Sequence, residues 1–359
     1  MVGDKVLVGM SGGVDSSVAA ALLMDQGYEV QGVTLRLFSN DDIGINDKTR
    51  TCCSLSDVED ARSVCYKLGI EHYVFNFGEQ FKKDVIARFA ESYDKGETPN
   101  PCIECNRYIK FSKMLERAVL MEQDYIATGH YANIGYDENT GRYLLKKAKD
   151  VTKDQTYMLY PLTQEQLSRT LFPLGNLTKP EIREIAEQRG LINARKPDSQ
   201  DICFVKDGDY AGFIKREWGV KAIEGNFIDS TGDILGKHSG IIHYTIGQRK
   251  GLGLSFDSPR YVVDKDKENN TVTLGKSEEL YKKSLMARDI NLISIASLTE
   301  PMRVTAKTRY SQTENAATIY PRENGQIYVE FDEPQRAITK GQAVVFYTGD
   351  VVVGGGTIM

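Results

Sequence analysis

Residues 10–17 combine glycines and hydroxyl side chains in the order expected of a phosphate-binding turn. This segment, here called the phosphate turn, reads MSGGVDSS and lies between an apolar run at 5–10, typical of a strand, and an alanine- and leucine-rich run at 18–23, typical of a helix. Glycines let the backbone approach an anion, serines supply hydroxyls, and a helix N-terminus adds N–H donors and a favourable dipole. The pattern predicts a cradle for nucleotide phosphates, and a glycine-rich turn without a ligand is the weaker alternative.

The acidic residue in the phosphate turn indicates what kind of nucleotide site this is. No Gly-Lys-Ser/Thr ending follows the glycines, so the turn is not of the Walker type. Asp15 would repel a purely anionic ligand, and a Mg²⁺ ion between Asp15 and the phosphates would remove that conflict. The string SGGVDS at 11–16 resembles the signature of the PP-loop ATP pyrophosphatases. That resemblance implies cleavage of ATP between its α- and β-phosphates, with adenylation of an oxygen on a second substrate.

Two cysteines in polar loops are candidates for the rest of the chemistry. Cys105 ends the proline-rich segment TPNPCIEC and comes just before a helix predicted to begin near Asn106. Because a thiolate at a helix N-terminus is stabilised by the helix dipole, we expect Cys105 to be nucleophilic near neutral pH. Cys203 follows the polar stretch KPDSQDI, whose turn-forming residues mean that its thiol need not be buried.

Composition restricts the class of protein. The chain has 359 residues, six cysteines and a net charge of −5, and no apolar run is long enough to span a bilayer. Since no charged-then-apolar leader is present, we expect a cytoplasmic protein with reduced thiols and no membrane contact. An acidic average excludes a globally basic nucleic-acid binder, so any RNA site must be a local patch.

Alternating strand and helix patterns predict the frame that positions these loops. The N-terminal pattern favours an α/β fold with a doubly wound parallel sheet, with strands at 5–10, 28–37, 72–77 and 124–128 and helices at 57–68, 80–93, 106–121, 163–170 and 179–189. Beyond about residue 218, a small central β-rich domain and a C-terminal β-barrel are expected, with strands at 240–246, 261–263, 271–274, 303–309, 316–320, 326–331 and 343–347. The predicted domains are 1–207, 208–275 and 276–359.

Seven motifs follow one another along the chain and together indicate a family. They are SGGVDS at 11–16, TPNPxxxCN at 98–106, TGHYA at 128–132, KDQ at 153–155, DSQDICF at 198–204, IGQRKG at 246–251 and GGGTI at 354–358. The ordered set covers nearly the whole chain and resembles the tRNA-specific 2-thiouridylase family. The resemblance implies a PP-loop ATP-binding catalytic domain, a central tRNA-binding domain and a terminal β-barrel.

The resemblance implies a tRNA-uridine 2-sulfurtransferase that forms 2-thiouridine, AMP and pyrophosphate. ATP would adenylate the 2-oxygen of the wobble uridine while bound by Gly9, Met10, Ser11, Gly12, Gly13, Val14, Asp15, Ser16, Leu35 and Gly129. Cys203 would carry a persulfide whose outer sulfur attacks the activated carbon. Cys105 would then release that sulfur to the base and form a disulfide with Cys203.

Contacts with RNA and with a sulfur donor are implied in the same way. Because the base must leave the anticodon stack to be reached, it would meet the loop residues Asn100, Pro101 and Cys102. The tRNA would also be contacted by Lys153, Asp154, Gln155, Arg309 and Tyr310. The implied partners are the wobble-uridine tRNAs for Glu, Gln and Lys and a cysteine desulfurase or sulfur-relay protein.

Cys102 departs from the family pattern, since some members carry Asp there, and this leaves a second mechanism open. Cys102, Cys105 and Cys203 supply three thiolates, enough to hold a [4Fe-4S] cluster with one iron open to bind sulfide. A PP-loop amidotransferase or ligase acting on a small molecule and a non-catalytic, ATP-regulated RNA-binding module are further alternatives. Neither of these two would give the loop thiols a role.

Several other side chains are interpreted as structural. His130 is expected to be a hydrogen-bonding residue, Cys65 a small core residue and Trp218 a helix anchor at a domain junction. Cys52 and Cys53 are expected to be structural or incidental, because adjacent cysteines chelate poorly. A strand at 303–309 would place four polar or basic residues on one face, where they meet either RNA phosphates or only solvent: Arg303, Thr305, Lys307 and Arg309.

Overall fold

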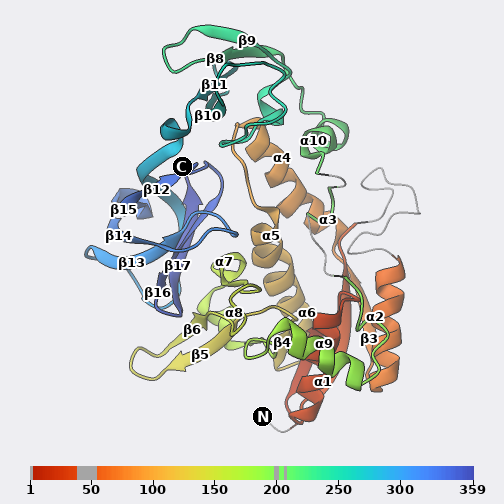
Figure 1. The fold of residues 1–359 in the computed structure, drawn as a ribbon. Helices are drawn as coiled ribbons and strands as arrows, with labels where there is room; N and C mark the ends of the chain where they lie inside the picture. The colour runs from red at the N-terminus through yellow and green to blue at the C-terminus, as the bar shows by residue number, and fades with distance from the viewer. Residues whose placement is uncertain (1–2, 39–54, 198–201, 206–207) are drawn as a thin grey trace.

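A five-stranded parallel sheet forms the frame of the N-terminal part of the chain (Figure 1). The computed structural model describes residues 3–38, 55–197, 202–205 and 208–359. The strand order is β3-β2-β1-β4-β7 and every pairing is parallel. The strands are β1 (Lys5–Gly9), β2 (Glu29–Arg36), β3 (His72–Asn76), β4 (Tyr125–Ala127) and β7 (Thr170–Leu171).

Alternating side chains of β1 show that helices cover both faces of this sheet. Val6 and Val8 pack into one cluster with α1 (Val14–Asp25), α2 (Leu55–Leu68) and α9 (Lys179–Gln188), whereas Leu7 points to the other face. On that face it meets the helix that continues through α5 (Pro101–Glu104), η3 (Cys105–Lys113) and α6 (Met114–Leu120). The predicted doubly wound α/β fold is therefore confirmed.

The helix that carries Cys105 begins earlier than predicted. It starts at Pro101, with Asn100 as N-cap accepting the backbone N–H of Cys102 at 3.1 Å. Asparagine at the cap and proline in the first turn are strong start signals, although the proline-rich segment at 98–105 predicts a loop that ends near Asn106. A second continuous helix precedes it, formed by α3 (Gly78–Phe81), η2 (Lys82–Ile86) and α4 (Ala87–Asp94).

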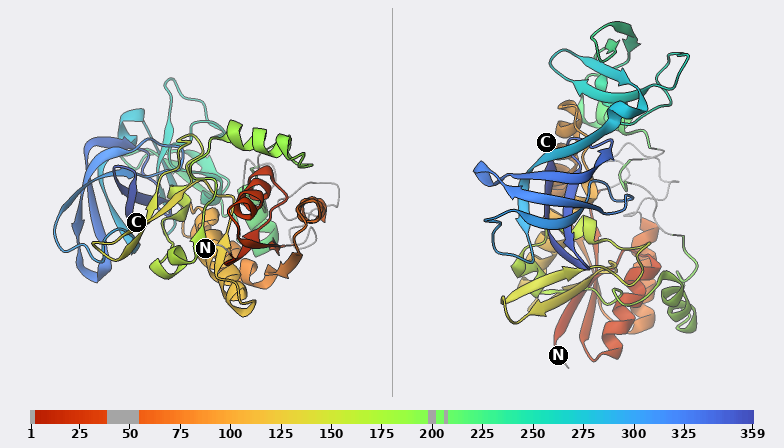
Figure 2. Two further views of the ribbon diagram at one scale, coloured as in Figure 1. Left: turned by 90° about the horizontal axis from the view of Figure 1, so that it is seen from below. Right: turned by 60° about the vertical axis from the view of Figure 1, so that its left-hand side comes forward.

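The central β unit lies at the end of the molecule opposite the N-terminus (Figures 1 and 2). After α10 (Tyr210–Trp218), four strands pair in the order β10-β11-β8-β9, namely β8 (Gly225–Ile228), β9 (Ile234–His238), β10 (Tyr261–Asp266) and β11 (Thr271–Gly275). The strand predicted at 240–246 is wrong, because Gly240 adopts φ 123° and a 3₁₀ turn, η4 (Ile241–His243), follows it. Ile241 and Ile242 are both buried, which a strand with one solvent face would not allow.

Six C-terminal strands close into a barrel through the β12–β17 pairing. They are β12 (Tyr281–Leu292), β13 (Met302–Lys307), β14 (Asn315–Pro321), β15 (Ile327–Arg336), β16 (Ala343–Thr348) and β17 (Val351–Ile358), with the short turns η5 (Ser277–Leu280) and η6 (Glu323–Gly325). The predicted β-barrel is confirmed. Within the described ranges, no helix combines the length and apolar character that crossing a membrane requires.

A hairpin from the N-terminal part joins the barrel sheet, and the sequence patterns had not indicated it. Strands β5 (Asn133–Asp137) and β6 (Arg142–Lys146) extend the sheet through the pair Val351–Lys146. The short helices α7 (Thr156–Leu159) and α8 (Gln164–Ser168) fill the junction, where the Tyr157 hydroxyl donates to the Ala343 carbonyl at 2.8 Å. The barrel is thus fixed to the loops that follow β4.

Candidate functional site

The phosphate turn is held against β2 by backbone and side-chain bonds. Gly9 ends β1, and the next residue, Met10, donates its N–H to Val33 at 2.7 Å and accepts from the Thr34 hydroxyl at 2.8 Å. Ser16 and Ser17 both donate to the Gly13 carbonyl, at 3.1 and 3.0 Å. These serines therefore shape the turn rather than reach outward.

The N-terminus of α1 is suited to an anion. The helix starts at Val14, a buried residue, and its N-cap is Gly13, which has no side chain to cap the first N–H groups. These donors and the helix dipole are left to a ligand. Leu35 in β2 and Gly129, just after β4, lie at the carboxyl ends of strands that flank β1. Ligands of doubly wound sheets bind at this edge.

Gly129 packs so closely against α1 that no side chain fits. A Cβ at this position would lie 2.7 Å from the Ser16 nitrogen and 2.8 Å from the Asp15 carbonyl carbon. We expect Gly129→Ala to push the first turn of α1 away and to lower the free energy of unfolding by about 1–3 kcal/mol, with a matching loss of ATP affinity. Thermal unfolding and ATP titration check this. Gly69→Ala, where a Cβ meets no atom within 4 Å but the φ of +72° is strained, should lower stability without lowering ATP affinity. Equal losses of ATP affinity in both variants would contradict the steric explanation.

Asp15 has a partner in the structure that the sequence patterns did not indicate. Its two carboxylate oxygens accept from Lys179 Nζ at 2.7 and 2.8 Å, and one also accepts from the Tyr131 hydroxyl at 2.7 Å. The Lys179 side chain is only 10% exposed and that of Asp15 31%. Lysine thus neutralises the carboxylate that would repel phosphates. The sequence predicts a helix beginning at Lys179, and the structure confirms it, but no local signal links this helix to Asp15.

Two thiols that are far apart along the chain pack against the same hydrophobic cluster. Cys105 is 7% exposed within a cluster that includes Leu37, Ile109 and Phe204, and Cys203 lies against that cluster. The prediction that Cys105 benefits from a helix N-terminus is wrong, because the helix begins four residues earlier, at Pro101. Cys102 occupies the first turn instead and is exposed.

The described cysteines do not form a metal centre with the other residues that the structure places. Cys65, Cys102, Cys105 and Cys203 are thiols. In residues 3–38, 55–197, 202–205 and 208–359, no group of three or more His, Cys, Asp or Glu is arranged to hold a metal ion. Cys52 and Cys53 lie outside the described residues.

Cys65 is a core residue, as predicted. It is fully buried in α2, and burial raises the pKa of its thiol to about 11, although a backbone hydrogen bond acts in the opposite direction. A thiol with this pKa remains protonated at pH 8 and is a poor nucleophile. We expect Cys65 to resist iodoacetamide in the native protein at pH 8 and to react once urea unfolds the chain. Peptide mass spectrometry measures this, and native labelling of Cys65 as fast as that of Cys102 would contradict the burial argument.

His130 also takes the structural role expected of it. Its Nδ1 shares a hydrogen bond with the Thr128 hydroxyl at 2.7 Å, and its ring packs against Phe111 and Phe172 at 5.6 and 6.1 Å. Burial, and after it the charge of Lys110, lowers the pKa of His130 well below its usual value. A neutral imidazole is therefore favoured near neutral pH.

The residues of the Lys153–Gln155 motif differ in what their side chains do. Asp154 accepts from the Ala148 N–H at 2.9 Å and from the Thr156 hydroxyl at 2.6 Å, and burial raises the pKa of its carboxyl. Gln155 accepts from the Tyr131 N–H at 2.9 Å. Asp154 thus holds the loop to the segment after β6 and to the start of α7, and Gln155 holds it to the segment after β4.

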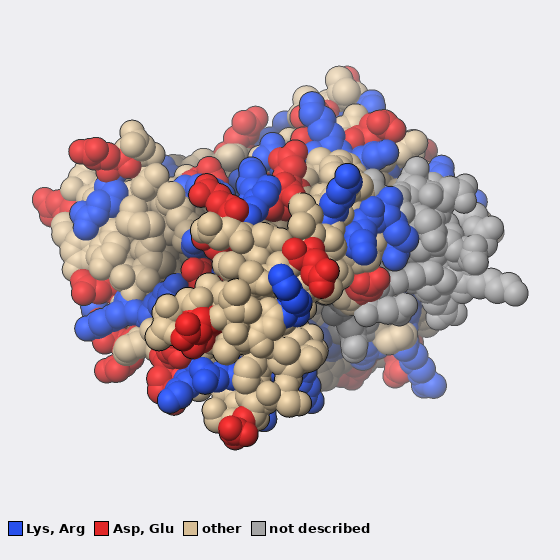
Figure 3. All heavy atoms as spheres, turned by 90° about the horizontal axis from the view of Figure 1, so that it is seen from above, with Lys and Arg blue, Asp and Glu red and all other residues tan. Residues whose placement is uncertain are grey.

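The basic face predicted for 303–309 is not continuous. Strand β13 ends at Lys307, and Arg303 is held by both carboxylate oxygens of Asp332 at 2.7 and 2.8 Å. Arg309 turns inward and donates to the carbonyls of Ile246 and Ala337 at 3.2 and 2.8 Å. On the face shown in Figure 3, too, lysines and arginines are interspersed with acidic side chains.

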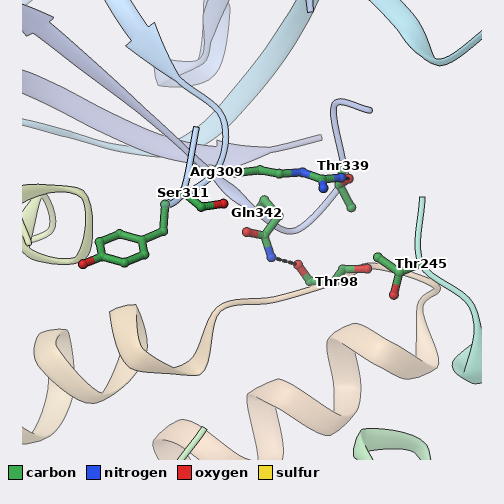
Figure 4. A pocket seen from close by; sticks show the side chains of 7 residues that line it. Thr98, Thr245, Arg309, Ser311, Thr339 and Gln342 are labelled. Carbon is green, nitrogen blue, oxygen red and sulfur yellow. Dashed lines mark hydrogen bonds between the residues drawn. The ribbon is translucent and has the colours of Figure 1, made fainter. Parts of the chain in front are cut away.

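A pocket of about 280 Å³ lies where the barrel meets the loop before α5 (Figure 4). Its lining consists of Thr98, Thr245, Arg309, Tyr310, Ser311, Thr339 and Gln342. Gln342 crosses to the loop by donating to the Thr98 carbonyl at 2.6 Å. Burial raises the pKa of Tyr310. The charges of Asp154 and Cys102 also raise it, whereas the charge of Lys153 lowers it. The Tyr310 ring therefore lies near both predicted sets of RNA contacts, the one at 100–102 and the one at 153–155.

Comparison with known proteins identifies the family. A family model described as the tRNA methyl transferase HUP domain matches residues 4–207, and models described as the tRNA methyl transferase PRC-barrel domain and the aminomethyltransferase beta-barrel domain match 211–276 and 282–358. The tRNA-specific 2-thiouridylase MnmA of Acetivibrio thermocellus is 58% identical over 354 residues, 99% of each chain. The chain belongs to the tRNA-specific 2-thiouridylase family.

A second relative agrees with this family membership. The tRNA-specific 2-thiouridylase MnmA of Clostridioides difficile is 56% identical over 354 residues, which are 99% of this chain and 98% of that one. A solved structure of a 4-thiouridine synthetase–RNA complex with bound ATP is 18% identical, covers 54% of this chain and 43% of its own, and has a TM-score of 0.37. The domain descriptions mention methyl transfer, whereas both full-length relatives are 2-thiouridylases.

Proposed function

We propose that this protein is a tRNA-uridine 2-sulfurtransferase that uses ATP to activate the wobble uridine. The observation that carries the proposal is that β2 contacts the phosphate turn and leads into the hydrophobic cluster that contains Cys105. Val33 and Thr34 bind the phosphate turn through Met10, and Leu37, just beyond the strand, packs in the cluster that contains Cys105 and contacts Cys203. The strand that holds the phosphate turn thus leads directly into the hydrophobic cluster of the two thiols, in a chain of this family.

The first step in this proposal is adenylation. The 2-oxygen of the uracil attacks the α-phosphorus of ATP, and pyrophosphate leaves, so that a poor leaving group becomes a good one. The N-terminus of α1 would bind the phosphates, with the residues from Gly9 to Ser16 around them and Leu35 and Gly129 beside the nucleoside. Preorganised N–H donors stabilise the charge that develops on the leaving pyrophosphate.

Sulfur transfer then uses the two thiols in turn. The outer sulfur of a Cys203 persulfide attacks carbon 2 and displaces AMP, which joins Cys203 to the base through a disulfide. The Cys105 thiolate attacks the Cys203 sulfur, the sulfur on the base takes the electron pair as the C=S bond, and a Cys105–Cys203 disulfide remains. A thiol reductant and a new persulfide, from a cysteine desulfurase or relay protein, would restore the enzyme.

A Mg²⁺ ion fits this site as a companion of ATP. The ion commonly takes one or two carboxylates and completes its shell with phosphates and water. Asp15 supplies one carboxylate at the start of α1, and Lys179 balances its charge when no ion is bound. Asp15 would hold the ion, which in turn would neutralise the phosphates during adenylation.

A [4Fe-4S] cluster fits the described residues less well than a persulfide. Cys102 is exposed on the first turn of α5. Cys105 lies one turn later and is buried in the hydrophobic cluster against which Cys203 packs. Among the placed residues, these three thiols do not group as metal ligands. We therefore favour the persulfide, and iron analysis of anaerobically purified protein tests the choice. Stoichiometric iron that disappears in Cys102→Ala would reverse it.

The pocket between the barrel and the loop before α5 supports the proposed RNA contacts. Asn100, Pro101 and Cys102 begin the helix beside it, and would meet the extruded base. Tyr310 lines the pocket and offers an aromatic face on which a base can stack. Lys153 would contact phosphate, while Asp154, Gln155 and Arg309 would hold the surfaces on which tRNAs for Glu, Gln or Lys dock.

The test is a reconstituted reaction with defined components. Purified protein, a tRNA for Glu, ATP with Mg²⁺, cysteine and a cysteine desulfurase should yield 2-thiouridine by mass spectrometry of nucleosides, with one AMP and one pyrophosphate released for each modified base. A tRNA with guanosine at the wobble position serves as the control and should remain unmodified. Thiolation without ATP, or AMP release without thiolation, would contradict the proposal.

A further inference from the structure

The carbonyl of Gly12 in the phosphate turn accepts two side-chain donors from one distant segment. Asn193 Nδ2 lies 3.1 Å from this oxygen, and Lys196 Nζ also lies 3.1 Å from it. Both donors come from the segment just after α9, well over a hundred residues further along the chain. Gly12 itself has φ +73°, and a Cβ there would lie 2.4 Å from the Asp57 carbonyl oxygen, so the turn is packed tightly on this side.

The geometry of the peptide group makes this contact relevant to anion binding. In a trans peptide the C=O and N–H groups point in opposite directions within one plane. Donors that hold the Gly12 carbonyl on one side therefore point the Gly13 N–H to the other side. Gly13 is the N-cap of α1, where a phosphate would bind. A cation on the carbonyl also polarises the peptide and strengthens its N–H as a donor.

Lys196 is itself held in place by two carboxylates of α2. Its ammonium donates to Asp57 Oδ1 and Asp60 Oδ2, both at 2.7 Å, while its side chain is 23% exposed. Burial lowers the pKa of Lys196, but the bonds and charges of Asp57 and Asp60 outweigh it and raise the pKa above its usual value. The ammonium therefore stays charged and fixed beside the Gly12 carbonyl.

Asn193 donates two hydrogen bonds while its own side-chain acceptor stays unpartnered in the described part of the chain. Its Nδ2 also donates to the Ser17 hydroxyl at 2.8 Å, but its buried Oδ1 has no hydrogen-bond partner among the described protein residues. A buried acceptor of this kind costs stability, and a leucine of similar size would avoid it. Sites that keep such a cost are frequently functional.

We infer that Asn193 and Lys196 are positioning residues that hold the Gly12–Gly13 peptide in the orientation that binds the phosphates of ATP. This inference rests on the proposed function. The two side chains act through the backbone of the turn and do not touch the nucleotide. Their effect is on the affinity of the turn for phosphate, so it precedes and is independent of sulfur transfer.

The test measures ATP affinity and thermal stability of the full chain without tRNA. Calorimetric titration with ATP and Mg²⁺ should show a Kd raised roughly tenfold in Asn193→Leu and by about ten- to a hundredfold in Lys196→Met, since the second bond is charge-assisted. Lys196→Arg keeps the charge and should recover most of the affinity. The melting temperature of Asn193→Leu should stay within about 2 °C of wild type or rise.

The matched control is Lys67→Met. Lys67 Nζ also donates to a backbone carbonyl of the region after α9, that of Gly190, but makes no bond to the phosphate turn. Its Kd for ATP should equal that of the wild type. If Lys196→Met does not fold, Asn193→Leu decides alone.

A Kd for ATP equal to that of the wild type in Asn193→Leu would overturn the inference. This holds whether or not the melting temperature of the variant falls. A wild-type protein that does not bind ATP at all would instead overturn the proposed function. The two failures are therefore distinguishable in one set of titrations.

Discussion

Replacing Cys203 by serine is expected to abolish 2-thiouridine formation while adenylation continues. A hydroxyl cannot carry a persulfide, so the covalent route is lost and the rate should fall on the order of a thousandfold or more. The phosphate turn and its contacts with β2 do not involve Cys203, so pyrophosphate exchange into ATP in the presence of tRNA should stay within about threefold of wild type. Nucleoside mass spectrometry and pyrophosphate exchange measure the two steps separately.

Two further cysteine variants test the order of the steps and control for the general effect of removing a thiol. Cys105→Ser should stop turnover after the base has been joined to Cys203, so a covalent protein–RNA adduct that thiols release should accumulate. Cys65→Ala changes a fully buried thiol that faces neither loop and should retain thiolation. Full thiolation by Cys203→Ser would show that Cys203 does not carry the sulfur, and loss of adenylation as well would contradict the predicted separation of the two steps.

The phosphate turn could be predicted because its chemistry is local. Glycines, serines and a helix start occur within a few residues of one another, and the structure places them as a strand, a turn and α1. The parallel sheet could be predicted because short apolar runs are separated by helix patterns, and the barrel because apolar and polar residues alternate along its strands. Residues 240–246 show the limit, because an apolar stretch that alternates like a strand forms a 3₁₀ turn after Gly240, which has φ 123°.

The partners of the phosphate turn could not be predicted, since each comes from a distant part of the chain. Lys179 reads as the first turn of a helix, and Asn193 and Lys196 read as an ordinary loop. Only folding brings them to Asp15 and Gly12. Arg309 shows the same limit, because the alternation at 303–309 predicts that its side chain shares a face with Arg303, whereas its guanidinium donates to the carbonyls of Ile246 and Ala337.

Lys179→Met is expected to impair both folding and adenylation, because it leaves Asp15 without its cation. Removing one partner of a poorly exposed ion pair leaves an uncompensated charge, and since Asp15 is partly exposed, we expect a loss of about 1–3 kcal/mol in the free energy of unfolding. The uncompensated carboxylate also repels the phosphates proposed to bind at α1. Adenylation should therefore fall on the order of a hundredfold in kcat/KM, most strongly at low Mg²⁺.

A double-mutant cycle measures the interaction free energy of the Lys179–Asp15 pair separately from the effects of the single substitutions. If Lys179 acts by neutralising Asp15, Asp15→Asn should recover much of the stability lost in Lys179→Met, and the two effects should not add. Lys149→Met is the matched control on the same helix start, because Lys149 pairs with Glu181 at 2.9 Å but both side chains are about half exposed. It should cost less than about 0.5 kcal/mol and leave adenylation unchanged. Additive losses in the cycle would mean that Lys179 serves the site in some way other than through Asp15.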